Sequence, residues 1–409
     1  MRLLVLVSII LPLLIQNVTS LPAVDPDQDD PVPYVPPPVN YTGYFKPLHD
    51  EFEQPLKGQT RIYYIAAEET TWDYVPNQKD MIHGLSLPDS PAHTKLISSS
   101  TTIGSKYIKA LYREYTDASF TVLKPRPSWQ GNMGPILRAQ VGDTLQVHFW
   151  NRAAHNYTIH PHGVHYAFEQ EGAVYKGATE NSYVAPGGNF TYTWSVLPRA
   201  GPGPEDGDSL VWGYHSHVHD TDLYDGLYGA IIVYKAGMLN QTTIDREVVS
   251  TVFCKQFHRV GFAQHLNISV ALDENHSQYL QKTITEFAPQ LNKDAIQQDT
   301  TSKDAYRFSN IKNSINGVMY GDFRDLAFPI NQTITWYLLG WGDFFDISYV
   351  SWESAEVTLF EKKVTHVRLL PATFQTVHVR PMKIGKLKFG FLDNQSGALG
   401  MSMLYRVTR

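Results

Sequence analysis

Two short histidine runs offer the residue types and the spacing of a metal site. The first run spans residues 160–165 and the second spans residues 215–220, and together they hold six of the sixteen histidines of the chain. Each run begins with a His-x-His pair. Alternate residues of an extended strand point to the same face, so each pair presents two imidazoles side by side. Two such strands that meet would offer four nitrogens to copper or zinc.

Short strands separated by glycine and proline turns surround both runs. In the first half, the strand-like segments are 61–67, 107–122, 134–150 with a tight turn at 141–143, 190–194 and 227–234. In the second half they are 248–257, 268–272, 333–339 and 385–390. For the polar stretch 275–309 we predict no strand or helix. Many short strands without a long helical period indicate an all-β fold built as sandwiches or barrels.

Length and charge place the chain among globular proteins of more than one domain. At 409 residues it exceeds the usual size of a single domain, and we predict a first domain at 58–240 and a second at 241–409. The net charge of −6 gives no indication of nucleic-acid binding. The acidic, proline-rich stretch at 21–57 is predicted to be an extended tail.

The N-terminus has the pattern of a secretory signal peptide. Arg2 precedes an apolar run that is too short to span a membrane, and small residues end a predicted signal at 1–20. No later stretch reaches membrane length, so we expect a secreted, extracellular protein without a membrane span. The single cysteine, Cys254, excludes an internal disulfide and is interpreted as a buried, inert thiol. In a secreted chain the Asn-x-Ser/Thr motifs are predicted glycosylation sites. They occur at Asn40, Asn156, Asn189, Asn240, Asn267, Asn275, Asn331 and Asn394.

Several longer strings of the sequence resemble one family closely and in the same order. They are Ile-Tyr-Tyr-Ile-Ala-Ala at 62–67, Tyr-Arg-Glu-Tyr-Thr-Asp at 112–117, Val-Gly-Asp-Thr at 141–144, His-Pro-His-Gly-Val at 160–164, Tyr-His-Ser-His-Val at 214–218, Asp-Glu-Asn at 273–275 and Ile-Asn-Gly at 315–317. The chain resembles one repeat of the multicopper oxidases of the ceruloplasmin and hephaestin type. The same repeat forms the A domains of blood-clotting factors. The resemblance covers residues 58–409.

The resemblance implies two Greek-key, cupredoxin-like β-barrels packed side by side. In that family three such repeats form a ring, and the His-x-His pairs of the first barrel supply half of the ligands of a three-copper cluster. By motif position these ligands correspond to His160, His162, His215 and His217. The resemblance therefore implies copper as the cofactor and makes ferrous iron the candidate substrate.

The matching motifs of the second barrel have lost their metal ligands. The family's second histidine motif corresponds to residues 347–354, where Glu353 alone could bind a metal. The strand that carries the family's electron-accepting copper corresponds to residues 390–401, where Met401 alone remains. A copper of that kind needs a thiolate and two imidazoles for its redox tuning. We therefore expect the second barrel to be free of copper.

Residues around the family motifs also depart from the pattern. The family's first-domain disulfide corresponds to Ser209 and Tyr234, and the acid-poor loop 172–181 gives little support for a calcium site. His219 follows the second pair and is an additional candidate ligand. The acidic side chains nearby are interpreted as solvated loop charges: Asp220, Asp222 and Asp225.

Two functional hypotheses follow, and the sequence leaves both open. In the first, the chain is a secreted copper-binding relative of the ferroxidases with a partial three-copper site and no complete oxidase activity of its own. The missing half would then come from a homotrimer or from a paralogue that bears histidines. In the second, the chain is a non-catalytic extracellular binding module, like the clotting-factor A domains.

Overall fold

The computed structural model describes residues 57–175, 182–240, 246–254, 272–323, 326–342, 348–392 and 400–409. These residues belong to one compact unit, Glu51–Arg409. The predicted signal, all of the predicted tail except Lys57, and the motifs at Asn40, Asn267 and Asn394 lie outside the described residues. Most of the segment predicted as a strand at 268–272 lies outside them as well.

The first half of the chain forms two facing four-stranded sheets. One has the order β4 (Lys106–Tyr115), β1 (Thr60–Asp73), β6 (Thr144–Asn151) and β8 (Asn189–Ser195). The other has the order β5 (Ile136–Gln140), β10 (Tyr228–Tyr234), β9 (Ser209–His215) and β7 (His160–Pro161). Strand β6 shows why the sequence folds this way, because its residues alternate strictly between buried and half-buried. The buried face contributes Leu145, Val147 and Phe149 to the core between the sheets.

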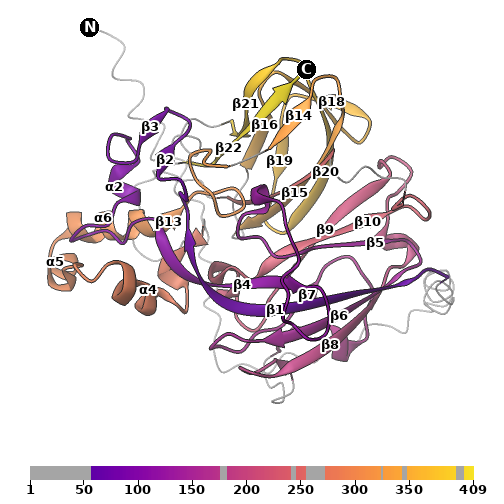
Figure 1. Ribbon diagram of the computed structural model, residues 1–409, viewed down its shortest axis with the longest axis horizontal. Helices are drawn as coiled ribbons and strands as arrows, with labels where there is room; N and C mark the ends of the chain where they lie inside the picture. The colour runs from indigo at the N-terminus through magenta and orange to yellow at the C-terminus, as the bar shows by residue number, and fades with distance from the viewer. Residues whose placement is uncertain are drawn as a thin grey trace, which may run out of the picture. The chain divides into compact units, whose positions relative to one another are not determined.

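The second half of the chain repeats this architecture with two five-stranded sheets (Figure 1). One has the order β11 (Glu247–Cys254), β15 (Ile334–Gly342), β20 (Thr373–Pro381), β17 (Ala355–Leu359) and β18 (Lys362–Val364). The other has the order β14 (Ala327–Pro329), β22 (Ser402–Thr408), β21 (Gly385–Phe391), β16 (Ser348–Trp352) and β19 (Val367–Leu369). Trp336, Phe389 and Tyr405 fill the core between these sheets. The prediction of two cupredoxin-like β-barrels is confirmed. The domain boundary at residue 240 stays a prediction.

Strand β10 joins the two barrels. All seven of its residues are buried, because Ile231 and Val233 face the first core while Ala230 and Ile232 belong to the core of the second barrel. A strand covered on both faces is expected to be a continuous apolar run, as residues 227–234 are. Strands β15 and β20 pack against the neighbouring strand β9. The second barrel therefore lies directly behind the strand that carries His215.

A buried polar cluster surrounds Ser209 and Tyr234, the two residues predicted to match the cysteines of the family's first-domain disulfide. Ser209 and Tyr234 are cross-strand partners on β9 and β10. The Ser209 hydroxyl lies 2.7 Å from the Tyr337 hydroxyl, and Tyr337 and Tyr234 both donate hydrogen bonds to the Glu247 carboxylate at 2.7 and 2.9 Å. Arg138 pairs with the same carboxylate. Hydrogen bonds between side chains of both barrels thus connect this region, where a disulfide would link β9 to β10.

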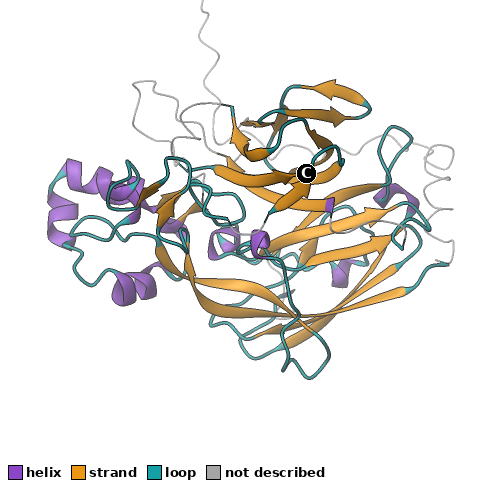
Figure 2. Cartoon of the chain, turned by 45° about the horizontal axis from the view of Figure 1, so that its top comes forward, coloured by secondary structure: helices purple, strands orange, loops and turns teal. Residues whose placement is uncertain are grey.

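The polar stretch 275–309 folds into helices, which the sequence did not predict. They are α4 (Leu280–Phe287), α5 (Lys293–Gln298) and α6 (Thr300–Asn310), and they form one group in Figure 2. The other short α-helices and strands of the described residues are α2 (His93–Leu96), α3 (Asp222–Asp225), the pair β2 (Lys79–Asp80) and β3 (Leu85–Ser86), and the pair β12 (Leu272–Asp273) and β13 (Ile311–Lys312). The side chains of Asn292 and Asp299 accept hydrogen bonds from the first free amides of α5 and α6. Such caps begin helices, so these two residues were the signals available in the sequence.

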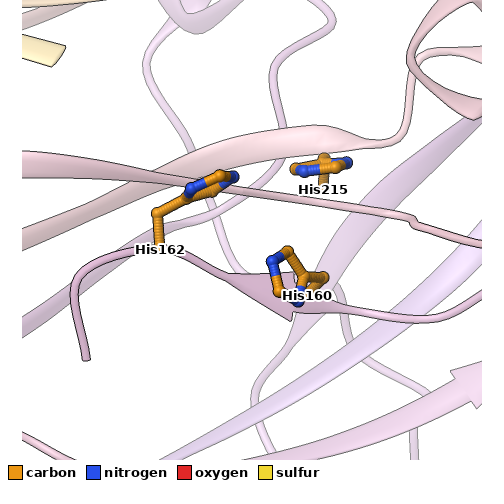
Figure 3. A group of neighbouring side chains, drawn as sticks. All are labelled: His160, His162 and His215. Carbon is orange, nitrogen blue, oxygen red and sulfur yellow. The ribbon is translucent and has the colours of Figure 1, made fainter. Parts of the chain in front are cut away.

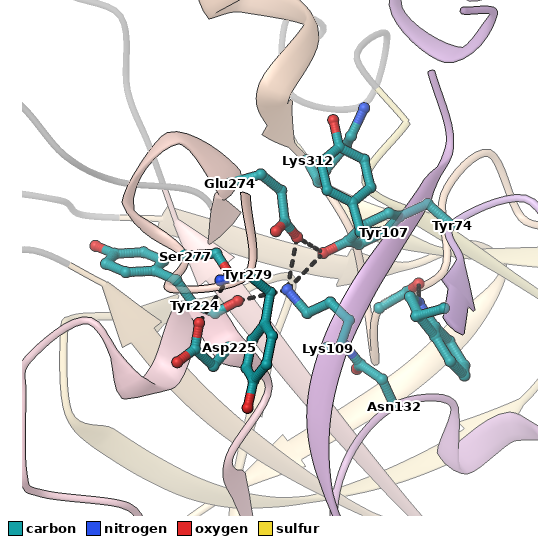
Figure 4. Close-up of polar contacts among 12 residues, drawn as sticks. Tyr74, Tyr107, Lys109, Asn132, Tyr224, Asp225, Glu274, Ser277, Tyr279 and Lys312 are labelled. Carbon is teal, nitrogen blue, oxygen red and sulfur yellow. Dashed lines mark hydrogen bonds and ion pairs between the residues drawn. The ribbon is translucent and has the colours of Figure 1, made fainter. Parts of the chain in front are cut away.

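A buried ion pair fastens the helical segment to the first barrel. The Lys109 ammonium on β4 lies 2.6 Å from the Glu274 carboxylate, and both side chains are fully buried. The Tyr74 hydroxyl donates to the same carboxylate oxygen (Figure 4). Nearby, the buried Lys312 ammonium donates to the carbonyls of Gly104 and Ser309 at 2.7 and 2.6 Å. Among the described residues, no helix is long and apolar enough to cross a membrane.

Candidate metal centre

The register between β7 and β9 brings the two histidine runs together. His160 on β7 is the direct cross-strand partner of His215 on β9. The pairing continues past the end of β7, because the His162 amide donates to the Gly213 carbonyl at 2.9 Å. His162 and Gly213 lie two residues from the first pair, so they share its face of the sheet. The alternation that suggested a metal site therefore places three imidazoles on one face.

Two glycines allow the chain to pass closely around these histidines. Gly163 follows His162 with a φ of +76°, and a Cβ there would lie 2.1 Å from the Trp212 ring. At Gly213 a Cβ would meet the rings of Trp341 and Phe374 at 2.6 and 2.7 Å. The first glycine turns the chain after the His-x-His pair, and the second lets the second barrel approach β9. Neither position tolerates a side chain without movement of its neighbours.

His160, His162 and His215 form a compact group of ligand atoms (Figure 3). One ring nitrogen of each lies within 4.8 Å of those of the other two, and all three residues are partly buried. Among the residues that the structure describes, this is the only group in which three histidine, cysteine or carboxylate side chains approach so closely. His217 completes the set on the exposed side, with its ring centre 5.1 Å from that of His160 and 5.4 Å from that of His215.

Each of the three grouped imidazoles has a ring nitrogen without a hydrogen-bond partner among the described residues. Nδ1 of His160 lies 2.8 Å from the Glu171 carbonyl, and Nδ1 of His215 lies 2.8 Å from the Ser216 carbonyl. A carbonyl only accepts, so each Nδ1 carries the proton and each Nε2 keeps its lone pair. Nε2 of His162 is buried and has no hydrogen-bond partner among the described residues. An outer hydrogen bond from one nitrogen with the other free is the usual state of a metal-binding histidine.

Burial keeps these imidazoles neutral. It lowers the pKa of His162 to about 4, and the neighbouring imidazoles of His160 and His217 act in the same direction. Burial also lowers the pKa of His215 well below its usual range. For His160 burial lowers the pKa, although the bond to the Glu171 carbonyl opposes this effect. Neutral imidazole is the form that binds a metal, so the site is prepared for a cation at neutral pH.

The second barrel closes one side of the histidine group with aromatic rings. The Trp341 ring lies edge-on to His162 and His215, with ring-centre distances of 6.1 and 5.5 Å. Phe374 lies 5.3 Å from His162. Trp341 is buried and Phe374 is partly buried. Among the described residues, the second barrel therefore covers one side of the histidine group with aromatic rings.

Comparison with known proteins connects this geometry with a family. A model of the multicopper oxidase family matches residues 130–237, the segment that contains both histidine runs. A human protein named Ferroxidase HEPHL1 is 35% identical over 335 residues, which cover 80% of this chain and 27% of the relative. Human hephaestin is 31% identical with 86% and 29% covered, and human ceruloplasmin is 32% identical with 78% and 29% covered. The chain belongs to the multicopper oxidase family. It spans less than a third of the length of these relatives.

Solved structures agree on the fold of this family member. A copper nitrite reductase from Nitrosomonas europaea has a TM-score of 0.51 at 14% identity, covering 86% of this chain and 94% of that one. The multicopper oxidase mgLAC has a TM-score of 0.50 at 12% identity, with 86% of both chains covered. At such identities the likeness concerns the two-barrel fold alone.

The imidazole group fits the copper of the family. Its three grouped donors are all nitrogens of neutral imidazoles, a ligand type that suits copper and zinc. The buried, unpartnered Nε2 of His162 also fits, since a buried polar atom without a partner is unfavourable until something binds it. His160, His162 and His215 would hold the ion, with His217 beside them at the surface. Copper bound there would supply one-electron redox chemistry.

Two acidic residues that looked solvated are in fact buried supports of the second histidine run. Asp222 is fully buried and accepts hydrogen bonds from the Ser216 hydroxyl at 2.6 Å and from the amides of Val218 and His219 at 3.1 and 3.2 Å. Asp225 is also fully buried and accepts bonds from Tyr157, Ser277 and Gln278. Asp220 is exposed, as expected. The interpretation of all three as solvated charges was wrong for Asp222 and Asp225.

The candidate ligands outside the group lie elsewhere. Glu353 is exposed at the end of β16, where its carboxylate accepts a bond from the Lys388 amide at 3.2 Å. His219 is exposed, and its backbone amide donates a hydrogen bond to the Asp222 carboxylate. Met401 is buried in the core of the second barrel. Cys254 ends β11, and its side chain lies outside what the structure describes. Loop 172–181 is described only as far as residue 175, so the expectation about calcium stays a prediction.

The predicted glycosylation motifs differ in exposure. Asn189, Asn240 and Asn331 are exposed, as a glycan requires. Asn156 is partly buried. Asn275 is partly buried too, and its side-chain oxygen accepts a bond from Asn310 at 2.9 Å. The three exposed asparagines are the better candidates among the described motifs, and glycosylation at any of them stays a prediction.

Proposed function

We propose that this chain is a secreted copper-binding protein of the multicopper oxidase family that carries half of a copper cluster. The ligands are His160, His162, His215 and His217. The observation that carries the proposal is the convergence of three imidazoles from two adjacent strands, each with a free nitrogen, within 4.8 Å. The buried supports around them resemble the outer hydrogen bonds that orient metal ligands.

The chain alone does not complete an oxidase. The second barrel covers the histidines with Trp341 and Phe374, and Glu353 stands exposed on its own at the position of the family's second histidine motif. A multi-electron oxidase needs an electron-accepting copper with thiolate and imidazole ligands, for which the sequence has no matching motif. Completion of the cluster would require another copy of this chain or a histidine-bearing paralogue. Ferrous iron is the proposed substrate of such an assembly, because one relative is named a ferroxidase.

A second candidate function is a non-catalytic extracellular scaffold. The observation in its favour is that the described part of the second barrel contains no group of three metal-binding side chains, although its architecture matches the first. In that case copper would hold the ends of β7 and β9 together without redox turnover. The two candidates share the metal site and differ only in what the bound copper does.

The test is to measure copper and ferrous oxidation on the full chain expressed through a secretory pathway. Copper per chain is measured by mass spectrometry for the wild type, for His160→Ala/His162→Ala, and for the control His148→Ala/His366→Ala, whose histidines lie outside the group. We expect bound copper in the wild type and the control and its loss in the first variant. Copper near zero in the wild type would refute the metal site. Bound copper without oxidation of ferrous iron would favour the scaffold.

A further inference from the structure

A cavity of about 560 Å³ lies away from the histidines, on the side of the first barrel where β4 and β5 meet the segment 123–130. Glu247 of β11 also lines it, so it opens beside the junction of the two barrels. None of the four proposed copper ligands lines this cavity. Its volume falls in the range of pockets that bind small molecules.

The charges that line this cavity do not balance. Four cationic side chains and two carboxylates face it. Lys124 pairs with Glu114 at 2.7 Å, and Arg138 pairs with Glu247. Both carboxylates are thereby used. Arg113 and Arg126 remain without a carboxylate partner among the described residues, which leaves an excess of two positive charges at the cavity.

The like charge of Arg113 acts on the remaining guanidinium group of Arg126. Burial and, to a smaller extent, this like charge together lower the pKa of Arg126 to about 10. Arg126 donates one hydrogen bond, from Nη1 to the Met133 carbonyl at 3.0 Å. A guanidinium has five donors, so most of its hydrogen-bonding capacity is still available. An anion placed between the two groups would relieve their repulsion and use these donors.

Flat aromatic and proline rings also line the cavity. Trp129, Pro125, Pro127 and Tyr63 line the cavity beside the two arginines. An inorganic anion would leave these surfaces unused. We propose that this cavity binds a small aromatic carboxylate, with its charged end between Arg113 and Arg126 and its ring against Trp129 and Pro127. The proposal concerns a ligand site separate from the copper site and does not depend on whether copper binds.

Calorimetric titration of the full chain with three probes tests this site. Benzoate carries both the charge and the ring, inorganic phosphate carries only charge, and benzyl alcohol carries only the ring. We expect benzoate to bind most tightly, and Arg126→Gln to weaken benzoate at least about tenfold, since hydrogen bonds to charged groups contribute that much. The matched control is Arg368→Gln, which removes the same charge from an exposed residue of β19 and leaves benzoate binding unchanged.

Each alternative outcome decides the question. Equal binding of benzyl alcohol and benzoate would overturn the role of the arginines. Equal binding of phosphate and benzoate would overturn the role of the ring surface. Unchanged benzoate affinity in Arg126→Gln would place any binding elsewhere. If thermal unfolding shows that this variant does not fold, Arg113→Gln takes its place with the same expected loss.

Discussion

The two barrels of this chain share an architecture and differ in the side chains near the ends of their strands. In the first barrel, His160 at the start of β7 is the cross-strand partner of His215 at the end of β9. In the second, strand β16, which we predicted to match the family's other histidine motif, carries Ser348, Ser351 and Trp352. Both barrels nevertheless have well-filled cores of buried aromatic and branched side chains.

This difference teaches that the fold and the histidine group are specified separately. The apolar alternation of the strands and the cores between the sheets build a cupredoxin-like barrel without any metal ligand. The histidines are an addition at one edge, where two strands meet in register. Replacing them should therefore change metal binding without changing the architecture.

The largest expected effect belongs to the core of the second barrel. Trp336 is fully buried, packs on Phe389 at 4.9 Å and donates to the Ser250 hydroxyl at 2.8 Å. Trp336→Ala should lower the free energy of unfolding by about 3–5 kcal/mol. Copper bound per folded chain should stay the same. Denaturant titration with copper analysis checks both, with the exposed Phe168→Ala as the control. Loss of copper at unchanged stability would break the separation.

The next effect is the response of stability to copper. Free copper at a hundred times its dissociation constant should raise the free energy of unfolding of the wild type by about 2.7 kcal/mol. His160→Ala/His162→Ala should abolish this gain, because the two strands then lack half of their ligands. Thermal midpoints with and without copper measure it. An equal copper-induced shift in this variant would place the metal outside the first barrel.

A positioning residue of the first barrel should affect both properties moderately. Asp222→Ala leaves the Ser216 hydroxyl and two amides without their acceptor. We expect a loss of about 1–3 kcal/mol in the free energy of unfolding. Copper affinity, measured by competition with a chelator, should fall about tenfold or more because His215 and His217 lose their support. The exposed neighbour gives the control, Asp220→Ala, for which neither quantity should move.

The last effect concerns a buried base in the second half of the chain. Burial lowers the pKa of Lys312 from 10.5 to about 7. Between these values the unfolded chain binds more protons than the folded chain, so stability from this residue rises with pH and is lost as pH falls toward 7. Lys312→Met should flatten the rise in unfolding free energy between pH 7 and pH 9, a part of that window, and the exposed Lys386→Met should not. An identical pH slope in both variants would show that Lys312 stays charged.

Several strands and the approach of the histidines were predictable because each depends on local pattern. Strand β6 alternates residue by residue, and β10 is a continuous apolar run. The His-x-His spacing placed His160 and His162 on one face of the sheet without knowledge of the partner strand. The helices of 275–309 were missed because their composition is polar, although Asn292 and Asp299 carried capping signals.

The environment of the site could not be predicted, because it depends on contacts between distant residues. Trp341 and Phe374 reach the histidines only through the packing of β15 and β20 against β9. Asp222 follows a histidine-rich segment, and the sequence around it is typical of a surface loop. In the structure, however, backbone amides of that segment donate hydrogen bonds to its carboxylate. The same holds for the cavity beside Arg113 and Arg126, whose charge balance appears only when the ion pairs of their neighbours are known.

The most direct measurement is electron paramagnetic resonance of the copper(II)-loaded chain, recorded beside its visible spectrum. Our account predicts couplings to several imidazole nitrogens and no intense thiolate-to-copper band, since the grouped donors are histidines. The nitrogen couplings should disappear in the variant that replaces His160, His162, His215 and His217 by alanine. A spectrum that survives this replacement, or an intense blue band that requires Cys254, would contradict the assignment of copper to the first barrel.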